Sequence, residues 1–169
     1  RSGVGAISRF DASGFPTRIA GEVRDFRAED FIEKKEIKKM DLFIQYTMAA
    51  ADMAIASSGL KIDDANAQRV GVIVGVGLGG LPTIEEYHGL FLDSGLKRIS
   101  PFMIPKLIAN LAPGQVAIKH GAKGINYTPT SACSSGGHAV GETRKVLADA
   151  AAELFEGLEL EAKPPLFCR

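Results

Sequence analysis

The sequence has few cysteines, no excess of charge and no long apolar run, and each absence excludes a class of protein. Only two cysteines occur in 169 residues, so we expect no disulfide framework and predict a reducing, cytoplasmic location. Lys plus Arg and Asp plus Glu both number 20, so the net charge predicts no nucleic-acid partner. The longest uncharged stretch, residues 124–141, is rich in Ser, Thr, Gly and Pro, which argues against a membrane-spanning segment.

The length and composition fit one compact domain. Hydrophobic residues make up 46% and charged residues 24% of the chain, close to the average for globular proteins. No basic segment followed by an apolar one opens the sequence, so no secretory signal is predicted. Because the first residue is Arg1 rather than Met, we expect the chain to be part of a longer protein or a processed product.

Apolar, β-branched runs predict two strands. Residues 70–76 (VGVIVGV) and 125–130 are each expected to be buried on both faces, and residues 18–26 could be a strand or an extended edge. Prolines bracket residues 100–105, so no regular helix should span them.

Helices are expected where apolar residues recur at helical spacing or where glycines supply a stop. The expected segments are residues 40–58 before Gly59, 83–93, 110–120 before Gly121, and 134–147 or beyond. Helices that alternate with apolar strands indicate an α/β architecture.

A glycine-rich segment, residues 75–80 (GVGLGG), follows the first strand and matches the G-x-G-x-x-G pattern of dinucleotide sites. Asp93 lies near the distance at which such a site needs an acid. Only nine residues separate Gly80 from Leu90, however, which leaves no room for a crossover helix and a second strand. We therefore interpret the segment as a tight turn beside a packed site.

Cys133 lies in the segment TSACSSGG (residues 130–137), between the second strand and the last helix. Small side chains on either side permit the sharp turn of a nucleophile elbow, and N–H groups of the following helix could stabilise a thiolate or an oxyanion. A small buried cysteine that packs at a strand end would show the same pattern. The local sequence leaves both interpretations open.

The three histidines supply no evident catalytic base and no metal-ligand spacing. His138 lies five residues after Cys133, and five helical residues rotate about 500°, so we expect it to point away from Cys133. His88 and His120 lie in polar surroundings near glycines and are predicted to be surface residues. No metal site is expected.

Four stretches taken together resemble a known family. KKMDLFIQY (38–46), GVGLGG (75–80), ISPFMIP (99–105) and TSACSSG (130–136) occur in the order found in the condensing enzymes of fatty-acid synthesis. The closest resemblance is to β-ketoacyl-acyl carrier protein synthase II and covers residues 1–147. It implies an incomplete thiolase-like fold, with most of the N-terminal αβαβα half, that is a homodimer when complete. Residues 148–169 depart from the family pattern as a divergent tail.

The resemblance also implies a reaction, a decarboxylative Claisen condensation of an acyl-enzyme thioester with malonyl-acyl carrier protein. Cys133 would be the acyl-accepting nucleophile, and no cofactor would be needed. Leu78, Phe102 and Met103 would line the acyl pocket. The acidic carrier protein would dock on five basic residues, which are Lys35, Lys38, Lys39, Lys97 and Arg98.

The same resemblance places both catalytic histidines in a second half beyond this sequence, so the chain alone is not expected to condense malonyl thioesters. Two alternatives remain, the ketosynthase domain of a polyketide synthase and a truncated, non-catalytic fragment or interaction module. Cys168 is expected to be an ordinary exposed thiol. A half-fold should also leave apolar surface uncovered.

Overall fold

The computed structural model describes residues 2–156 and has a short parallel strand pair at its centre. Strand β3 (Val72–Ile73) pairs with β4 (Asn126–Tyr127), with Val72 opposite Asn126. Single hydrogen bonds continue the pairing as far as Val76, whose N–H donates to the Pro129 carbonyl over 3.3 Å. The carboxyl ends of both strands therefore meet at one edge, where the glycine-rich turn and the cysteine segment begin.

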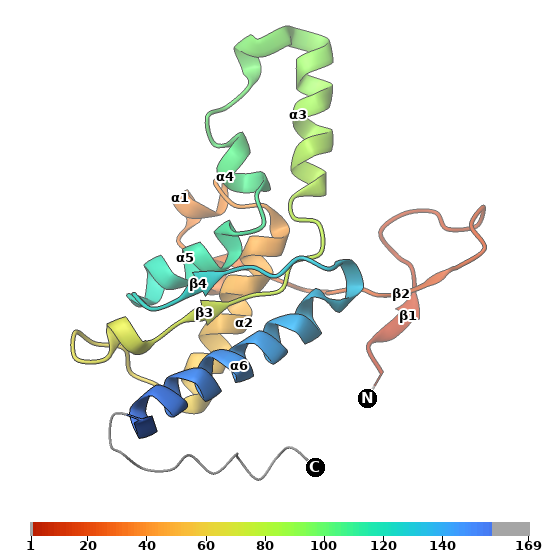
Figure 1. Ribbon diagram of the computed structural model, residues 1–169. Helices are drawn as coiled ribbons and strands as arrows, with labels where there is room; N and C mark the ends of the chain where they lie inside the picture. Colours follow the sequence, from red (N-terminus) through yellow and green to blue (C-terminus); the bar gives the residue numbers. More distant parts are fainter. Residues whose placement is uncertain (1, 157–169) are drawn as a thin grey trace.

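Helices surround this pair (Figure 1). They are α1 (Lys34–Ile37), α2 (Leu42–Ser58), α3 (Leu81–Ser94), α4 (Met103–Leu107), α5 (Leu111–His120) and α6 (Ser135–Glu156). Short 3-10 helices are η1 (Ala28–Asp30), η2 (Ala67–Arg69), η3 (Gly95–Arg98) and η4 (Ala132–Ser134). Strands β1 (Val4–Ala6) and β2 (Ile19–Gly21) form a separate antiparallel pair.

The predicted helix stops are confirmed, because both glycines have the left-handed backbone that ends a helix. Gly59 follows α2 with φ 68°, and Gly121 follows α5 with φ 72°. The segment 100–105 is also as expected, since α4 begins only at Met103 and contains Pro105 in its first turn.

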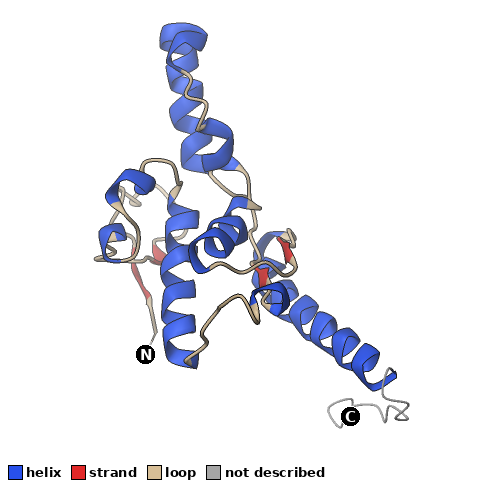
Figure 2. Cartoon of the chain, turned by 90° about the vertical axis from the view of Figure 1, so that its left-hand side faces the viewer, coloured by secondary structure: helices blue, strands red, loops and turns tan. Residues whose placement is uncertain are grey.

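The core lies where α2 and α5 pack against each other and against the strand pair. Ile44 and Ala112 are fully buried, and Met48 and Val116 are nearly so. Helix α6 contacts β3 as well, and Figure 2 shows the two strands between α5 and α6. This sandwich of helix, strand pair and helix confirms the predicted α/β architecture.

The prediction of strands buried on both faces is wrong for this structure. Residues 72–74 are only half-buried, and Ile125 is 48% exposed. Within residues 2–156 the parallel sheet has two strands, so its side chains lack the cover that neighbouring strands and layers would supply. A hollow of about 480 Å³, lined mainly by apolar residues of α2 and β3, runs along this open face.

Helices α3, η3 and α4 form an arm that projects from the body (Figure 1). We call residues 81–107 the arm and the rest of the α2, α5 and α6 assembly the body. Large apolar side chains stay exposed along the arm, with Leu92 at 69% and Leu96 at 76%. The expected uncovered apolar surface is thus found on the arm and the open face of the sheet, and also around β1 and β2, where Phe10, Phe15 and Ile19 are exposed.

Helix α6 continues without a break past residue 147, the predicted end of the family-like segment. That boundary remains a prediction. Residues 157–169, including Cys168, lie outside the described residues.

Candidate active site

Cys133 lies in the one-turn helix η4, directly between β4 and α6, and its side chain is exposed. The residue before it, Ala132, has φ 49°, a left-handed conformation that costs energy for any residue with a Cβ. A sharp, strained turn thus presents the thiol outside the packed core. This geometry agrees with the nucleophile-elbow interpretation and is inconsistent with a cysteine buried at a strand end.

The glycine-rich turn packs directly against the cysteine segment. A Cβ on Gly75 would collide with the backbone of Ser135 and Gly136, the first residues of α6. A Cβ on Gly77 would lie 3.1 Å from the Ala132 carbonyl oxygen. The glycines therefore let two backbone segments approach each other beside Cys133.

The other end of this turn leads into the arm. Gly79 has φ 92°, and the Gly80 N–H donates to the Leu107 carbonyl over 3.0 Å. Helix α3 follows at once, and Asp93 lies near its far end rather than after a second strand. The interpretation as a tight turn beside a packed site is confirmed, and the arrangement of a dinucleotide site is absent from residues 75–94.

Three hydrogen bonds secure the cysteine turn. The Ser131 N–H donates to Ser135 Oγ (2.9 Å), and the Ser135 hydroxyl donates to the Ala132 carbonyl (2.7 Å). A third bond of 2.6 Å joins Ser131 Oγ to His138 Nδ1. Ser135 is buried, so this network lies on the inner side of the turn.

The expectation that His138 points away from Cys133 assumed a helix that includes Cys133, and that assumption is wrong. Helix α6 begins only at Ser135, and the His138 ring turns back to Ser131, two residues before the cysteine. The sequence held a signal for this network, because serines just before a helix commonly bond its first turn.

The other two histidines differ from each other. His88 is exposed, as predicted. His120 is not a free surface residue, since its side chain is only 19% exposed and its Nε2 lies 2.9 Å from Asp52 Oδ1. Lys119 Nζ also contacts Asp52, and this cluster ties α5 to α2 away from Cys133.

A buried carboxylate that the sequence reasoning missed supports the glycine-rich turn. Asp41 is 6% exposed and precedes α2, where an aspartate usually caps its own helix. Its Oδ2 instead accepts hydrogen bonds from the backbone N–H (3.1 Å) and the hydroxyl (2.5 Å) of Thr83. Asp41 therefore joins the start of α2 to the first turn of α3, directly after Gly80.

The three predicted pocket residues lie apart in the described chain. Leu78 is 68% exposed and lines a hollow of about 360 Å³ with Phe43, Tyr46 and the glycine-rich turn. Phe102 and Met103 lie at the start of α4, with Phe102 47% exposed. Phe102 and Met103 are not among the residues that line the hollow beside Leu78.

The predicted basic residues lie at two separate places. Lys35, Lys38 and Lys39 are in or next to α1, whereas Lys97 and Arg98 lie in η3, between α3 and α4 of the arm. Lys35 and Lys39 pair with Glu33 and Glu36, both at 2.8 Å, while Lys38 is exposed. Lys39 Nζ also lies 5.6 Å from the centre of the Phe102 ring.

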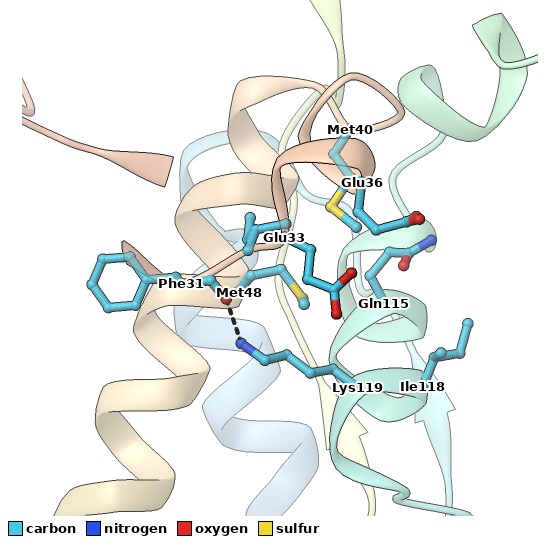
Figure 3. Close-up of a pocket in the computed structure, with 9 residues that line it drawn as sticks. Phe31, Glu33, Glu36, Met40, Met48, Gln115, Ile118 and Lys119 are labelled. Atoms are coloured by element: carbon cyan, nitrogen blue, oxygen red, sulfur yellow. Dashed lines mark hydrogen bonds between the residues drawn. The ribbon is translucent and has the colours of Figure 1, made fainter. Parts of the chain in front are cut away.

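A further hollow, of about 270 Å³, lies between α1, α2 and α5 (Figure 3). Met40 and Met48 line it, and Lys119 crosses it to donate to the Phe31 carbonyl over 2.6 Å. None of the predicted site residues lines this pocket, so it is separate from the candidate active site.

The described residues offer neither a metal-binding cluster nor a membrane-spanning helix. Residues 2–156 contain no group of three or more His, Cys, Asp or Glu side chains placed to hold a metal ion. Among the same residues, no helix combines the length and apolar character that crossing a membrane requires.

Comparison with known proteins identifies the family. Residues 1–154 match the model of the beta-ketoacyl synthase N-terminal domain. The chain belongs to the β-ketoacyl synthase family. It is 46% identical over 166 residues to 3-oxoacyl-acyl-carrier-protein synthase 2 of Coxiella burnetii, and 44% identical over 147 residues to the synthase of the same name from Synechocystis. These matches cover 97% and 87% of this chain but only 40% and 35% of the relatives, so the chain spans less than half of their length.

Solved structures confirm the thiolase-like fold of this β-ketoacyl synthase domain. A type II PKS ketosynthase in complex with its acyl-carrier protein matches 75% of the chain with a TM-score of 0.67 and 25% identity, and the match covers 37% of that chain. The ishigamide ketosynthase/chain length factor matches 77% with a TM-score of 0.62 and 29% identity, and the match covers 33% of that chain.

Proposed function

We propose that this chain is the nucleophile-bearing domain of a 3-oxoacyl-acyl-carrier-protein synthase that elongates fatty acids, with Cys133 as the residue that receives the acyl chain. The observation that carries the proposal is the position of Cys133, exposed on a strained turn between the carboxyl end of a parallel strand and the start of α6. The names of the most similar relatives support the substrate class.

The turn offers the groups that acyl transfer needs. Sγ of Cys133 attacks the carbonyl carbon of the acyl thioester, a new C–S bond forms, and the carrier thiol leaves with the cysteine proton. The N-terminal end of the α6 helix dipole stabilises both the attacking thiolate and the tetrahedral oxyanion. The acyl group is then bound to Cys133 as a thioester.

The second step, loss of CO2 from malonyl-carrier protein and attack of the resulting carbanion on the acyl-Cys133 thioester, needs groups that the described chain does not bring to the thiol. Within residues 2–156 no histidine is hydrogen-bonded to Cys133. We propose that the part of the protein corresponding to the remaining length of the relatives supplies the two catalytic histidines.

The acyl chain, we propose, runs past Leu78 toward α4, and a second subunit completes its pocket. Leu78, Phe102 and Met103 are turn or helix-start residues with exposed or half-exposed side chains, as expected where another surface covers them. Leu96→Glu in the complete protein should convert a dimer into monomers, measured by sedimentation velocity. An unmodified protein that sediments as a monomer would contradict the homodimer, and a variant that stays dimeric would contradict a place for Leu96 in the interface.

Carrier-protein docking is proposed on the basic residues near α1 and in η3 of the arm. Lys38 is exposed and unpaired in the described structure, whereas Lys35 already pairs with Glu33. Lys38→Glu should raise the KM for acyl carrier protein several-fold and leave a small thioester substrate unaffected. Lys61→Glu, at an exposed lysine outside both basic groups, is the matched control and should have little effect, and equal effects of Lys38→Glu on both substrates would argue against docking.

The test of the proposed function is a condensation assay on the complete protein with acyl- and malonyl-carrier protein. Cys133→Ala should abolish acylation and condensation, because no other group in the turn can form the thioester. Ser134→Ala, which removes an exposed neighbouring hydroxyl, should retain activity within about threefold. Acylation that survives Cys133→Ala would refute the assignment, and absence of acylation in the unmodified protein would favour a non-catalytic fragment.

A polyketide ketosynthase is the second candidate, since one of the similar solved structures is a type II PKS ketosynthase. The higher identity to fatty-acid synthases, 46% against 25%, favours fatty-acid elongation. Comparing saturated acyl chains with β-keto chains as acyl donors distinguishes the two, with saturated chains expected to react faster.

A further inference from the structure

We propose that Ser131 and His138 act together as positioning residues that hold the Cys133 turn in its reactive conformation. We call this pair the clasp; its bond joins Ser131 Oγ and His138 Nδ1 over 2.6 Å. The inference rests on the proposed function to the extent that acyl transfer is the reaction for which Cys133 is positioned.

The clasp closes the chain around the nucleophile. Ser131 lies two residues before Cys133, and His138 lies five residues after it in the first turns of α6. Their bond therefore encloses the whole of η4, including the thiol-bearing residue. Inside this loop Ser135 accepts from the Ser131 N–H and donates to the Ala132 carbonyl.

The enclosed turn needs such support because its backbone is unfavourable. Ala132 has φ 49°, and a residue with a Cβ stays in this region only where its surroundings hold it. Ser135 holds the Ala132 carbonyl, and Gly77 lies against the same carbonyl. The clasp fixes the residue before Ala132, so the three contacts together determine where Cys133 lies.

His138 acts through Ser131 rather than on the substrate. Its Nδ1 is engaged by the Ser131 hydroxyl, and no hydrogen bond between His138 and Cys133 occurs in the described part of the chain. A hydroxyl can donate to an unprotonated ring nitrogen or accept from a protonated one, so the clasp persists in either state of the ring. Its role is geometric and does not require proton transfer.

The experiment measures two rates at Cys133 of the 169-residue chain, located by peptide mapping. One is alkylation by iodoacetamide and the other is acylation by an acyl thioester of N-acetylcysteamine. The variants are Ser131→Ala, His138→Ala, the double variant, and the conservative changes Ser131→Thr and His138→Asn, which keep a hydroxyl and a polar atom close to the original Nδ1. Urea unfolding of each variant is measured in parallel.

Each alanine variant should slow acylation roughly tenfold, the double variant should be no slower than either single one, and both conservative variants should recover most of the rate. Unfolding midpoints should not follow this pattern, which separates positioning from a general loss of stability. Acylation rates within twofold of the unmodified chain in all variants, or additive losses in the double variant, would overturn the proposal.

Failure of the proposed function would look different. If the unmodified chain is alkylated at Cys133 but takes no acyl group, the proposed reaction is wrong for this chain. The alkylation rates of the variants then still decide whether the clasp positions the thiol, with the same tenfold loss and the same rescue expected.

Discussion

The body and the arm are both built from helices, but the body buries its apolar side chains and the arm leaves several of them exposed. In the body, α2 and α5 bury Ile44 and Ala112 completely, and Asp41 has hydrogen-bond partners for its buried carboxylate. In the arm, Leu92 and Leu96 are more than two-thirds exposed, although the helices that carry them are well formed. Regular secondary structure alone thus does not show whether the apolar side chains of a helix are buried.

The difference indicates which part of the site is complete in this chain. The turn that holds Cys133 is supported directly by the body, through the glycine-rich turn and the start of α6. The proposed acyl pocket and much of the docking surface lie on or next to the arm, where cover is missing. In this chain the position of the nucleophile is therefore established, whereas the surfaces proposed to bind the substrates remain uncovered.

The largest expected difference in stability between the body and the arm comes from replacing one large apolar side chain in each by alanine. Ile44→Ala should destabilise the chain by about 4 kcal/mol, because a fully buried residue leaves a cavity. Leu92→Ala, at a site 69% exposed on the arm, should change the free energy of unfolding by less than about 0.5 kcal/mol. Urea denaturation measures both, and similar losses for the two variants would contradict the contrast.

Two glycines extend this comparison. Replacing a glycine by alanine should lower the free energy of unfolding in the body and raise it in the arm. Gly75→Ala should cost about 3 kcal/mol, since the new Cβ collides with the backbone of Ser135. Gly89→Ala in α3 meets no atom within 4 Å and should stabilise by about 0.5–1 kcal/mol through helix propensity. Thermal unfolding would show a lower Tm for the first and a higher one for the second, and a neutral Gly75→Ala would mean that the two turns do not pack together.

The junction between body and arm depends on one carboxylate. Asp41→Ala leaves the N–H and hydroxyl of buried Thr83 without their acceptor, at an expected cost of about 2 kcal/mol. Asp149→Ala, an exposed position in α6, is the matched control and should be nearly neutral. Equal unfolding midpoints for the two variants would show that Asp41 does not join α2 to α3.

The smallest effect is expected in the β1–β2 region, as a dependence on pH. Hydrogen bonds from the Ser8 hydroxyl and N–H, aided by Arg9 and Arg24, lower the pKa of Glu22 from 4.5 to about 2. A lowered pKa contributes stability that is fully present above pH 4.5 and is lost as the pH falls toward 2.

Glu22→Gln should therefore flatten the decline in stability over this range of pH. Glu29→Gln, at an exposed carboxylate that makes no hydrogen bond in the described structure, should leave the decline unchanged. Parallel pH profiles for Glu22→Gln and the unmodified chain would contradict the assignment.

The sequence predicted the features that depend on neighbouring residues, and it did not predict those that depend on contacts between residues far apart in the chain. Helix ends at Gly59 and Gly121 follow from glycine's left-handed backbone, so they were predictable. The side chain of Asp41 bonds Thr83, 42 residues away, and no local pattern contains that information. Burial of residues 70–76 was overestimated because a β-branched run specifies a strand but does not supply the neighbours that would cover it.

Cys133 illustrates the same limit at the site itself. Its small neighbours predicted a sharp turn, and the structure has one. The last helix begins at Ser135 rather than at the cysteine, a difference of one or two residues. The bond from His138 to Ser131 was therefore not anticipated. The helical period does not specify where a helix starts, and it does not reveal the bonds that Ser135 makes to Ser131 and Ala132 just before the first turn.

The most direct test of the account is a two-stage reaction on the 169-residue chain, first with an acyl thioester of N-acetylcysteamine and then with a malonyl thioester. The account predicts that the acyl group is found on Cys133 by peptide mapping and stays there, with no release of CO2, because the nucleophile is positioned and the decarboxylating groups are absent from the described chain. An acyl group that appears on Cys168 or nowhere, or malonyl decarboxylation by the isolated chain, would contradict it.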